Sequence, residues 1–244
     1  MNFLKWWIMI RLINNELIKV GKWKIILSNL LFLTIILIIV KTSDSNIIDT
    51  SYRLIPFIGI LMCIIFGGTI SQEIENGTLR YYLTKPIKRW KIYLSKLITM
   101  HIFLIIVLSF IIIIYLIILK RIDKEFIILF IKESSSLFAL SSLILFISTI
   151  FRNTSISVGI SIFIIAFSSI IAQILFGLEL NFFQYTFLPY MDFNIISDKA
   201  SLDIMNKELG INLSINRGVI INMIYTFVIY LIGNYIFIKK DIKS

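Results

Sequence analysis

Six long apolar runs dominate the pattern of hydrophobic and polar positions along the chain. Each run is continuously apolar over about 17–25 residues, the length that a helix needs to cross a bilayer, whereas barrel strands alternate and are about half as long. The pattern therefore predicts an all-α integral membrane protein with six transmembrane helices in one domain over residues 1–244. The predicted spans are residues 23–40, 54–70, 97–119, 134–151, 154–176 and 219–238.

The composition supports a membrane protein, because 58% of the 244 residues are hydrophobic and only three prolines and ten glycines interrupt them. This share is well above that of a soluble domain. The fourth run is rich in serine, and residues 126–131 before it either extend it or lie at the membrane interface. The single cysteine, Cys63, lies in the second run, so no disulfide can form within the chain.

Residues 1–22 have helical periodicity, with basic and apolar residues on opposite sectors. One sector holds Lys5, Arg11, Asn15, Glu16, Lys19 and Lys22, and the other holds Phe3, Trp6, Ile10, Ile13, Leu17 and Val20. A basic face opposite an aromatic-rich apolar face predicts a helix in the membrane interface, with Gly21 allowing a bend into the first span. This helix is either a plain anchor or a lever that also touches a cytoplasmic partner. No small-residue cleavage pattern of a signal peptide follows the first run.

The basic residues predict the orientation of the chain. With six spans, fifteen Lys and Arg residues fall on the side of the two termini and of residues 71–96, against nine on the other side. The positive-inside rule then places both termini in the cytoplasm. Topology thus accounts for the net charge of +10, and no nucleic-acid-binding motif is present, so we expect no nucleic-acid partner.

Residues 71–96 are more elaborate than a plain connector. The second span is expected to continue as helix to about Glu75, and Asn76-Gly77 is a strong turn signal because both residues tolerate positive φ. Thr78 can cap a short helix that Pro86 ends. We expect the apolar positions of this helix to be exposed and to share one face that a partner protein buries. These positions are Leu79, Tyr82 and Leu83.

This segment resembles the coupling helix of the ABC-2 type permease family. The pattern is E-x-E-x-G-T-L, then a proline, basic residues and a lysine at the head of an apolar run. The matching positions are Glu73, Glu75, Gly77, Thr78, Leu79, Leu83, Pro86, Arg89 and Lys96. The number of spans, the leading amphipathic helix and the long segment before the last span also fit, so the resemblance covers essentially the whole chain. Tyr81 and Tyr82 occupy positions where shorter aliphatic residues are commoner in that family. This departure bears on which partner subunit the segment would recognise.

The resemblance implies a permease subunit whose coupling helix docks into a groove of an ATP-binding subunit, present in two copies. It implies that Glu73, Glu75, Gly77, Thr78, Leu79, Tyr82, Leu83, Pro86 and Arg89 couple to that ATPase. A second permease subunit, identical or homologous, would complete the pathway, with spans two and five at the interface. The interface candidates are Cys63, Thr69, Ser161 and Ser168. For residues 177–217 the resemblance implies an outer gate of short re-entrant helices, while the residues themselves fit an aromatic cap or an ordinary loop.

The chain lacks the means to hydrolyse ATP by itself. Its only Gly-Lys pair, Gly21-Lys22, is followed by Trp23, so no phosphate-binding loop exists. We therefore expect ATP and magnesium to be bound by the partner subunit, and no cofactor, catalytic residue or metal ligand in this chain. The single histidine, His101, is expected to be a packing residue and not a proton relay. The spans otherwise lack charge, which disfavours a secondary transporter and a membrane protease.

The sequence thus predicts the permease subunit of an ATP-driven exporter in a bacterial plasma membrane. The expected substrate class is an antimicrobial or amphipathic peptide or another hydrophobic compound. The alternative is a polytopic assembly or anchoring protein that transports nothing, followed by a secondary transporter. Besides the protein subunits, membrane lipid is the expected partner.

Overall fold

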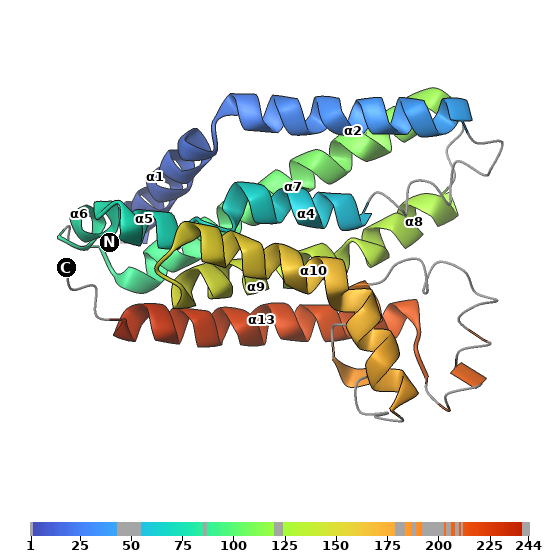
Figure 1. Ribbon diagram of the computed structural model, residues 1–244. Helices are drawn as coiled ribbons and strands as arrows, with labels where there is room; N and C mark the ends of the chain where they lie inside the picture. Colours follow the sequence, from blue (N-terminus) through green and yellow to red (C-terminus); the bar gives the residue numbers. More distant parts are fainter. Residues whose placement is uncertain are drawn as a thin grey trace.

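The computed structural model describes residues 2–42, 55–84, 87–119, 124–178, 184–186, 189–191, 203, 206–207, 210 and 212–240, and its principal elements are all helices (Figure 1). The prediction of an all-α protein is therefore confirmed. The elements are α1 (Asn2–Val20), α2 (Lys22–Thr42), α4 (Ile55–Phe66), α5 (Ser71–Glu75), α6 (Thr78–Leu83), α7 (Arg89–Leu119), α8 (Lys124–Glu133), α9 (Ser135–Ile150), α10 (Thr154–Gly177), the 3-10 helix η2 (Pro189–Met191) and α13 (Ile215–Lys239).

Four helical segments of the described chain are long and apolar enough to cross a membrane, not the six that the sequence predicted. Runs 23–40 and 154–176 do form helices, α2 and α10. However, α2 is not among the four over its described residues, and the described apolar stretch of α10, Thr154–Ser168, is shorter than a bilayer requires. The candidate spans are Pro56–Glu75, Arg89–Ile114, Phe130–Ile150 and Ile215–Lys239.

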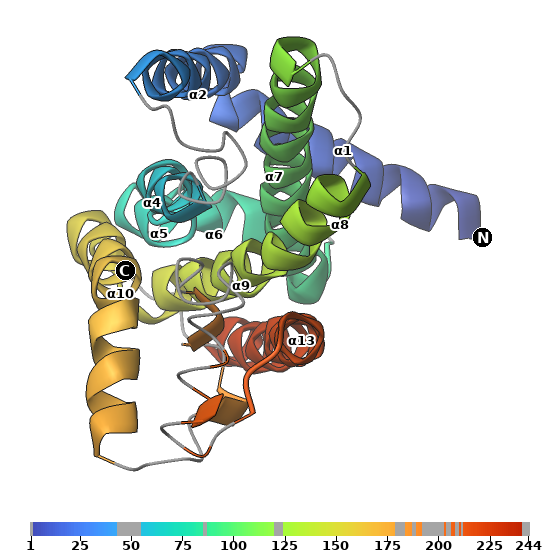
Figure 2. The ribbon, with the colours of Figure 1, turned by 90° about the vertical axis from the view of Figure 1, so that its right-hand side faces the viewer.

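Helix α9 is the centre of the bundle and contacts α4, α7, α10 and α13 (Figures 1 and 2). Its many serines allow close packing, and most of its residues are buried. Residues 126–131 fall within α8, which leads into α9 through a turn at Ser134, and the candidate span takes in the last two of them. Phe130 within them is buried.

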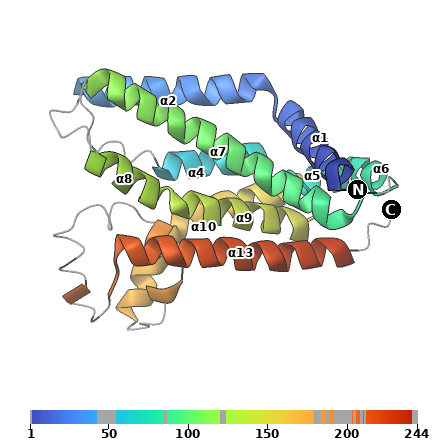
Figure 3. The ribbon, with the colours of Figure 1, turned by 180° about the vertical axis from the view of Figure 1, so that it is seen from behind.

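Helices α1 and α2 form an outer layer on α7, which runs diagonally in front of α2 in the view of Figure 3. Phe32 of α2 is fully buried in this contact layer. The predicted bend between the two helices is confirmed, because Gly21 separates α1 from α2 with φ of 79°, a conformation that glycine adopts without strain. Both termini lie at the end of the molecule that holds α5 and α6 (Figure 1).

The second span is broken before it reaches Glu75, where the sequence predicted continuous helix. Helix α4 ends at Phe66 and α5 begins at Ser71. Ser148 of α9 accepts hydrogen bonds from the backbone N–H groups of Ile70 (2.8 Å) and Ser71 (3.1 Å). Ser157 of α10 donates to the carbonyl of Gly67 (2.5 Å). Neighbouring helices thus bond to the backbone at the break, as a membrane interior requires.

Candidate functional site

Helices α5 and α6 form a compact projection at the end of the molecule that holds both termini. Gly77 joins them with φ of 70°, so the predicted turn and the short helix after it are confirmed. Thr78 is the first residue of α6, and its hydroxyl donates to the carbonyl of Glu73 (3.4 Å) without capping the helix. Pro86, the predicted end of the helix, and the side chain of Leu83 lie outside the described part.

A cluster of four charges, three of them buried, fastens this projection to the rest of the chain. It consists of Glu16 and Lys19 of α1, Glu73 of α5 and Lys96 of α7 and is called the α1–α5–α7 charge cluster below. Lys96 Nζ lies 2.8 Å from Glu73 Oε1 and 3.0 Å from Glu16 Oε2. Lys19 Nζ lies 2.5 Å from Glu73 Oε1 and 2.8 Å from Glu16 Oε1. The Lys96 side chain is completely buried, and two positive and two negative charges balance.

The cluster shifts the ionisation of its two α1 members in opposite directions. Burial by itself would raise the pKa of Glu16, but the ammonium groups of Lys96 and Lys19 hold that pKa below its ordinary value. Burial would lower the pKa of Lys19, but hydrogen bonds to Glu16 and Glu73 raise it. Both residues are therefore charged at neutral pH, and each stabilises the charge of the other.

Stability should fall in acid through protonation of Glu16. Because the folded-state pKa of Glu16 lies below the ordinary 4.5, its contribution is complete above pH 4.5 and is lost as the pH falls through the folded value. We expect the thermal midpoint of the wild type to fall more steeply below pH 4.5 than that of Glu16→Gln. The measurement is thermal unfolding in detergent between pH 3 and 7. A difference between the two proteins that stays constant over this range would contradict the prediction.

Glu16 was predicted on the solvent-facing polar sector of the leading helix, and this was wrong. The residues of α1 that pack inward are Met9, Leu12, Glu16 and Val20. Ile10, which was predicted on the apolar face, is 60% exposed. The buried face of α1 is therefore turned about the helix axis relative to the predicted face. It includes Glu16 because Glu16 pairs with Lys96 of α7. One signal in the sequence could have indicated this, since Glu16 is the sole acidic residue among residues 1–22.

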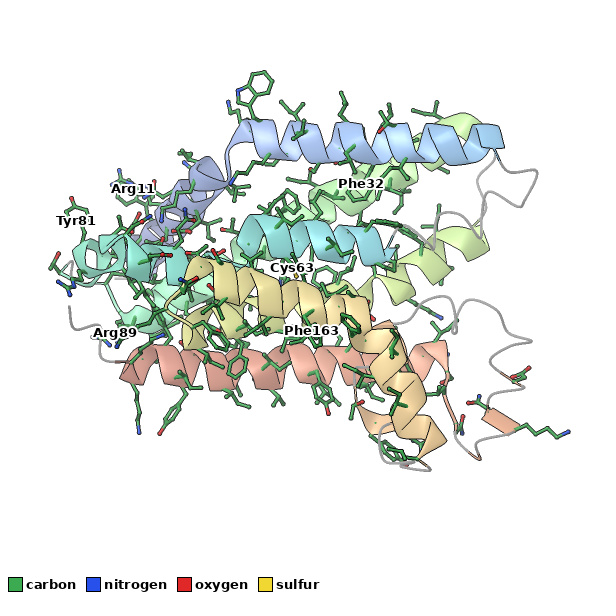
Figure 4. The ribbon with its side chains drawn as sticks, in the orientation of Figure 1. Arg11, Phe32, Cys63, Tyr81, Arg89 and Phe163 are labelled. Atoms are coloured by element: carbon green, nitrogen blue, oxygen red, sulfur yellow. The ribbon has the colours of Figure 1, made fainter. Side chains whose placement is uncertain are left out.

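Part of the predicted apolar face of α6 is not free for a partner. Leu79 is fully buried within the chain, which corrects the expectation that it is exposed. Tyr82 is half-buried, with Lys19 Nζ 4.5 Å from its ring centroid. Among the described side chains of α6, the exposed ones are instead Thr78, Arg80 and Tyr81, and Tyr81 is 66% exposed. Figure 4 shows Tyr81 at the tip of the projection.

Two further residues of the resemblance have structural partners. Glu75 Oε2 accepts hydrogen bonds from the backbone N–H (3.2 Å) and the hydroxyl (2.6 Å) of Thr154, at the start of α10. Arg89 Nη1 donates to the carbonyls of Ile238 (2.8 Å) and Lys240 (3.2 Å), at the end of α13. A carboxylate at a helix start and a cation at a helix end both complement the helix dipole. The projection is therefore attached to α10 as well as to α1 and α7.

The residues suggested for a subunit interface lie mostly inside the single chain. Cys63, Ser161 and Ser168 are buried, and the hydroxyls of Ser161 and Ser168 donate to carbonyls of their own helix. Thr69 is partly exposed and lines a cavity beside the charge cluster. By contrast, Phe163 of α10 (labelled in Figure 4) is 55% exposed.

Two hollows adjoin the projection. One, of about 520 Å³, lies between α1, the first turn of α2, the α4–α5 region, α6 and α7, beside the charge cluster. The other, of about 350 Å³, lies between α1 and α6 and is called the α1–α6 groove. It is lined by Trp7, Ile8, Arg11, Leu12, Asn15, Tyr82 and Ile87. The guanidinium of Arg11 stacks 3.2 Å from the centre of the Trp7 ring.

His101 is a packing residue, as the sequence predicted. Its Nε2 lies 2.8 Å from the hydroxyl of Ser141, and its ring meets that of Phe138 edge-on at 5.0 Å. Within the described ranges, no three His, Cys, Asp or Glu side chains are placed to hold a metal ion.

The fold and its apolar helices define a multi-pass helical membrane protein. A family model described as "Protein of unknown function (DUF2705)" matches residues 7–243, and the chain therefore belongs to this family. Among curated proteins, none matches the sequence.

Proposed function

We propose that this chain is the membrane subunit of an ATP-driven exporter and that the α5–α6 projection docks on a separate ATP-binding subunit. The observation that carries the proposal is the attachment of the projection. It is joined to α1 and α7 by the charge cluster and to α10 by Glu75. A projection fastened to three helices moves them together when a partner displaces it, which a plain connector would not do.

The proposed docking surface differs from the one that the resemblance implied. Leu79 is buried within the chain and stabilises the projection. The residues proposed to contact the ATPase are Arg80 and Tyr81, together with those that line the adjoining α1–α6 groove. Tyrosine, tryptophan and arginine are the residues that most often dominate the energy of protein interfaces. The groove already holds a stacked pair of this kind, Trp7 and Arg11.

The remaining parts of the proposal follow from the same assignment. The end with the two termini and the projection faces the cytoplasm, where the ATPases bind ATP and magnesium. The outer layer of α2 and the described part of α10 also lie in the membrane, because apolar side chains such as Leu27 (67% exposed) and Phe163 project outward. A second membrane subunit completes the pathway for a hydrophobic or amphipathic substrate such as a peptide. Most of residues 177–217, the suggested outer gate, lie outside the described ranges.

Docking should depend on the tip of α6. We expect Tyr81→Ala combined with Arg80→Glu to lower co-purification of the ATP-binding subunit roughly 30-fold, the effect of losing about 2 kcal/mol at an interface hot spot. The measurement is a pull-down of the tagged chain expressed with candidate ATP-binding subunits, read by quantitative blotting and by ATP hydrolysis. A matched control is Tyr185→Ala, at an exposed tyrosine (54%) far along the chain in the 177–217 segment.

Two results would contradict this function. Equal capture by the double variant and by the control would show that α6 is not the docking element. Failure of the wild type to retain any protein with a phosphate-binding loop would instead favour an anchoring or assembly protein.

The orientation can be tested by cysteine labelling. In a Cys63→Ala background, a cysteine introduced at Thr84 should react with an impermeant maleimide only after the membrane is permeabilised. A cysteine introduced at Tyr185 should react in intact cells, because the positive-inside rule places that segment outside. Both positions are exposed in the structure. Labelling of the Thr84 position from outside would reverse the proposed topology.

A further inference from the structure

The 520 Å³ cavity beside the charge cluster has the properties of an amphiphile-binding site. Its volume is within the range of small-molecule pockets. Charged and hydroxyl-bearing side chains line one part of it, including Lys24, Glu73 and Tyr81, and apolar side chains such as Val20 and Phe66 line another. Polar and apolar surfaces side by side suit a molecule that has a polar head and an apolar tail.

Two charged groups of this lining are incompletely paired. Glu73 Oε1 takes both ammonium groups of the cluster, while Glu73 Oε2 is buried and has no hydrogen-bond partner among the described residues. A carboxylate oxygen in this condition costs free energy unless a donor reaches it. Lys24 also lines the cavity, and it forms no ion pair with another described residue. One negative and one positive group are thus available for a ligand.

The cavity lies where a lipid headgroup would lie. It is formed at the junction of α1 and α2, at the ends of candidate spans Pro56–Glu75 and Arg89–Ile114. Beyond Lys24, α2 presents a row of outward apolar side chains suited to an acyl chain: Ile26, Leu27, Leu30 and Leu31. A ligand whose head binds Lys24 can therefore lay its tail along α2 without crossing a polar surface.

We infer that this cavity binds a phospholipid whose headgroup carries both a phosphate and a primary ammonium. The phosphate lies against Lys24, and the ammonium donates a hydrogen bond to the Glu73 carboxylate. Glu73 lines the cavity, and its terminal carboxylate torsion is broad, so a partial rotation turns the unpaired oxygen toward the ligand. A choline headgroup carries no N–H, and a glycerol headgroup carries no cation, so neither satisfies both groups.

The inference can be tested by counting retained lipids on the purified subunit in detergent, using native mass spectrometry. Phosphatidylethanolamine, phosphatidylcholine and phosphatidylglycerol with the same acyl chains are each titrated at equal concentration. We expect the ethanolamine lipid to bind roughly tenfold more tightly than the other two, the factor that one charge-assisted hydrogen bond provides. Lys24→Gln should reduce its binding to the level of the choline lipid.

The controls separate a specific site from general lipid adhesion. Lys22→Gln removes an equivalent exposed lysine that does not line the cavity and should leave binding unchanged. Glu73→Gln should abolish the preference for ethanolamine over choline. If this variant does not fold, Lys24→Gln still tests the inference, because Lys24 is exposed and its replacement should not affect folding. Displacement of the lipid by millimolar glycerophosphoethanolamine would identify the headgroup alone as the ligand. Equal binding of the three lipids, or equal effects of Lys24→Gln and Lys22→Gln, would overturn the inference.

Discussion

Replacing Lys96 by methionine should lower the free energy of unfolding by about 3–5 kcal/mol, the usual result of removing one partner from a buried ion pair. The Lys96 ammonium is completely buried and is shared by Glu16 and Glu73. Methionine fills a similar space but leaves two buried carboxylates with the single ammonium of Lys19. The expected fall in the thermal midpoint is roughly 6–20 °C for a chain of this size.

The chain contains its own reporter for this measurement. Cys63 is the single cysteine and is fully buried, so a thiol-reactive fluorophore should label it only as the protein unfolds. Lys91→Met is the matched control, because Lys91 lies on the same helix, is only half-buried and forms no ion pair with a described residue. The double variant Lys96→Met/Glu73→Gln should recover part of the loss, because charge balance returns. A single variant as stable as Lys91→Met would show that the cluster contributes little.

Replacing Gly67 by alanine should destabilise the protein by about 1–3 kcal/mol, through overpacking at the break in the second span. A methyl group on Gly67 would clash with the carbonyl oxygen of Cys63 and lie 3.0 Å from Cγ2 of Val158. The Cys63 atom is backbone and cannot rotate away. Relief of the clash therefore requires the backbone at Gly67 to shift, which would also disturb the hydrogen bonds of Gly67 with Cys63 and Ser157.

The matched control is Gly159→Ala on α10. A methyl group there would meet nothing within 4 Å, and alanine is the better helix former, so stability should stay the same or rise by up to about 1 kcal/mol. The thermal midpoint of each variant is measured through labelling of Cys63. Equal midpoints for Gly67→Ala and Gly159→Ala would mean that the two helices are not in close contact at the break.

The sequence was informative about features that depend on neighbouring residues along the chain. Long apolar runs predicted helices over α2, α4, α7, α9, α10 and α13 because a backbone in lipid must satisfy its own hydrogen bonds. Gly21 and Gly77 marked two of the turns that the structure shows, since glycine adopts positive φ without strain. The packing role of His101 could also be predicted, because a single histidine in an apolar helix has no neighbouring ionisable side chains with which to form a proton relay.

Other predictions failed because they concern which side of a helix meets which neighbour. Periodicity placed Glu16 among polar residues, but Lys96, eighty positions further along, draws it into the protein. It placed Leu79 on an exposed face, but the first turn of α6 packs that side chain inward. The break at Gly67 depends on the hydroxyls of Ser148 and Ser157, which the chain brings to the break from α9 and α10.

The sequence by itself therefore determined the helical membrane class, the local turns and the position of the projection between two apolar runs. Only the tertiary structure decided which charges are buried together, where the second span breaks and which side chains of α6 remain exposed. The physical reason is that local patterns fix backbone conformation, whereas a buried charge or a broken helix is stable only when distant groups supply its hydrogen bonds. In this protein those groups are Lys96 for the two buried carboxylates and two serines for the break.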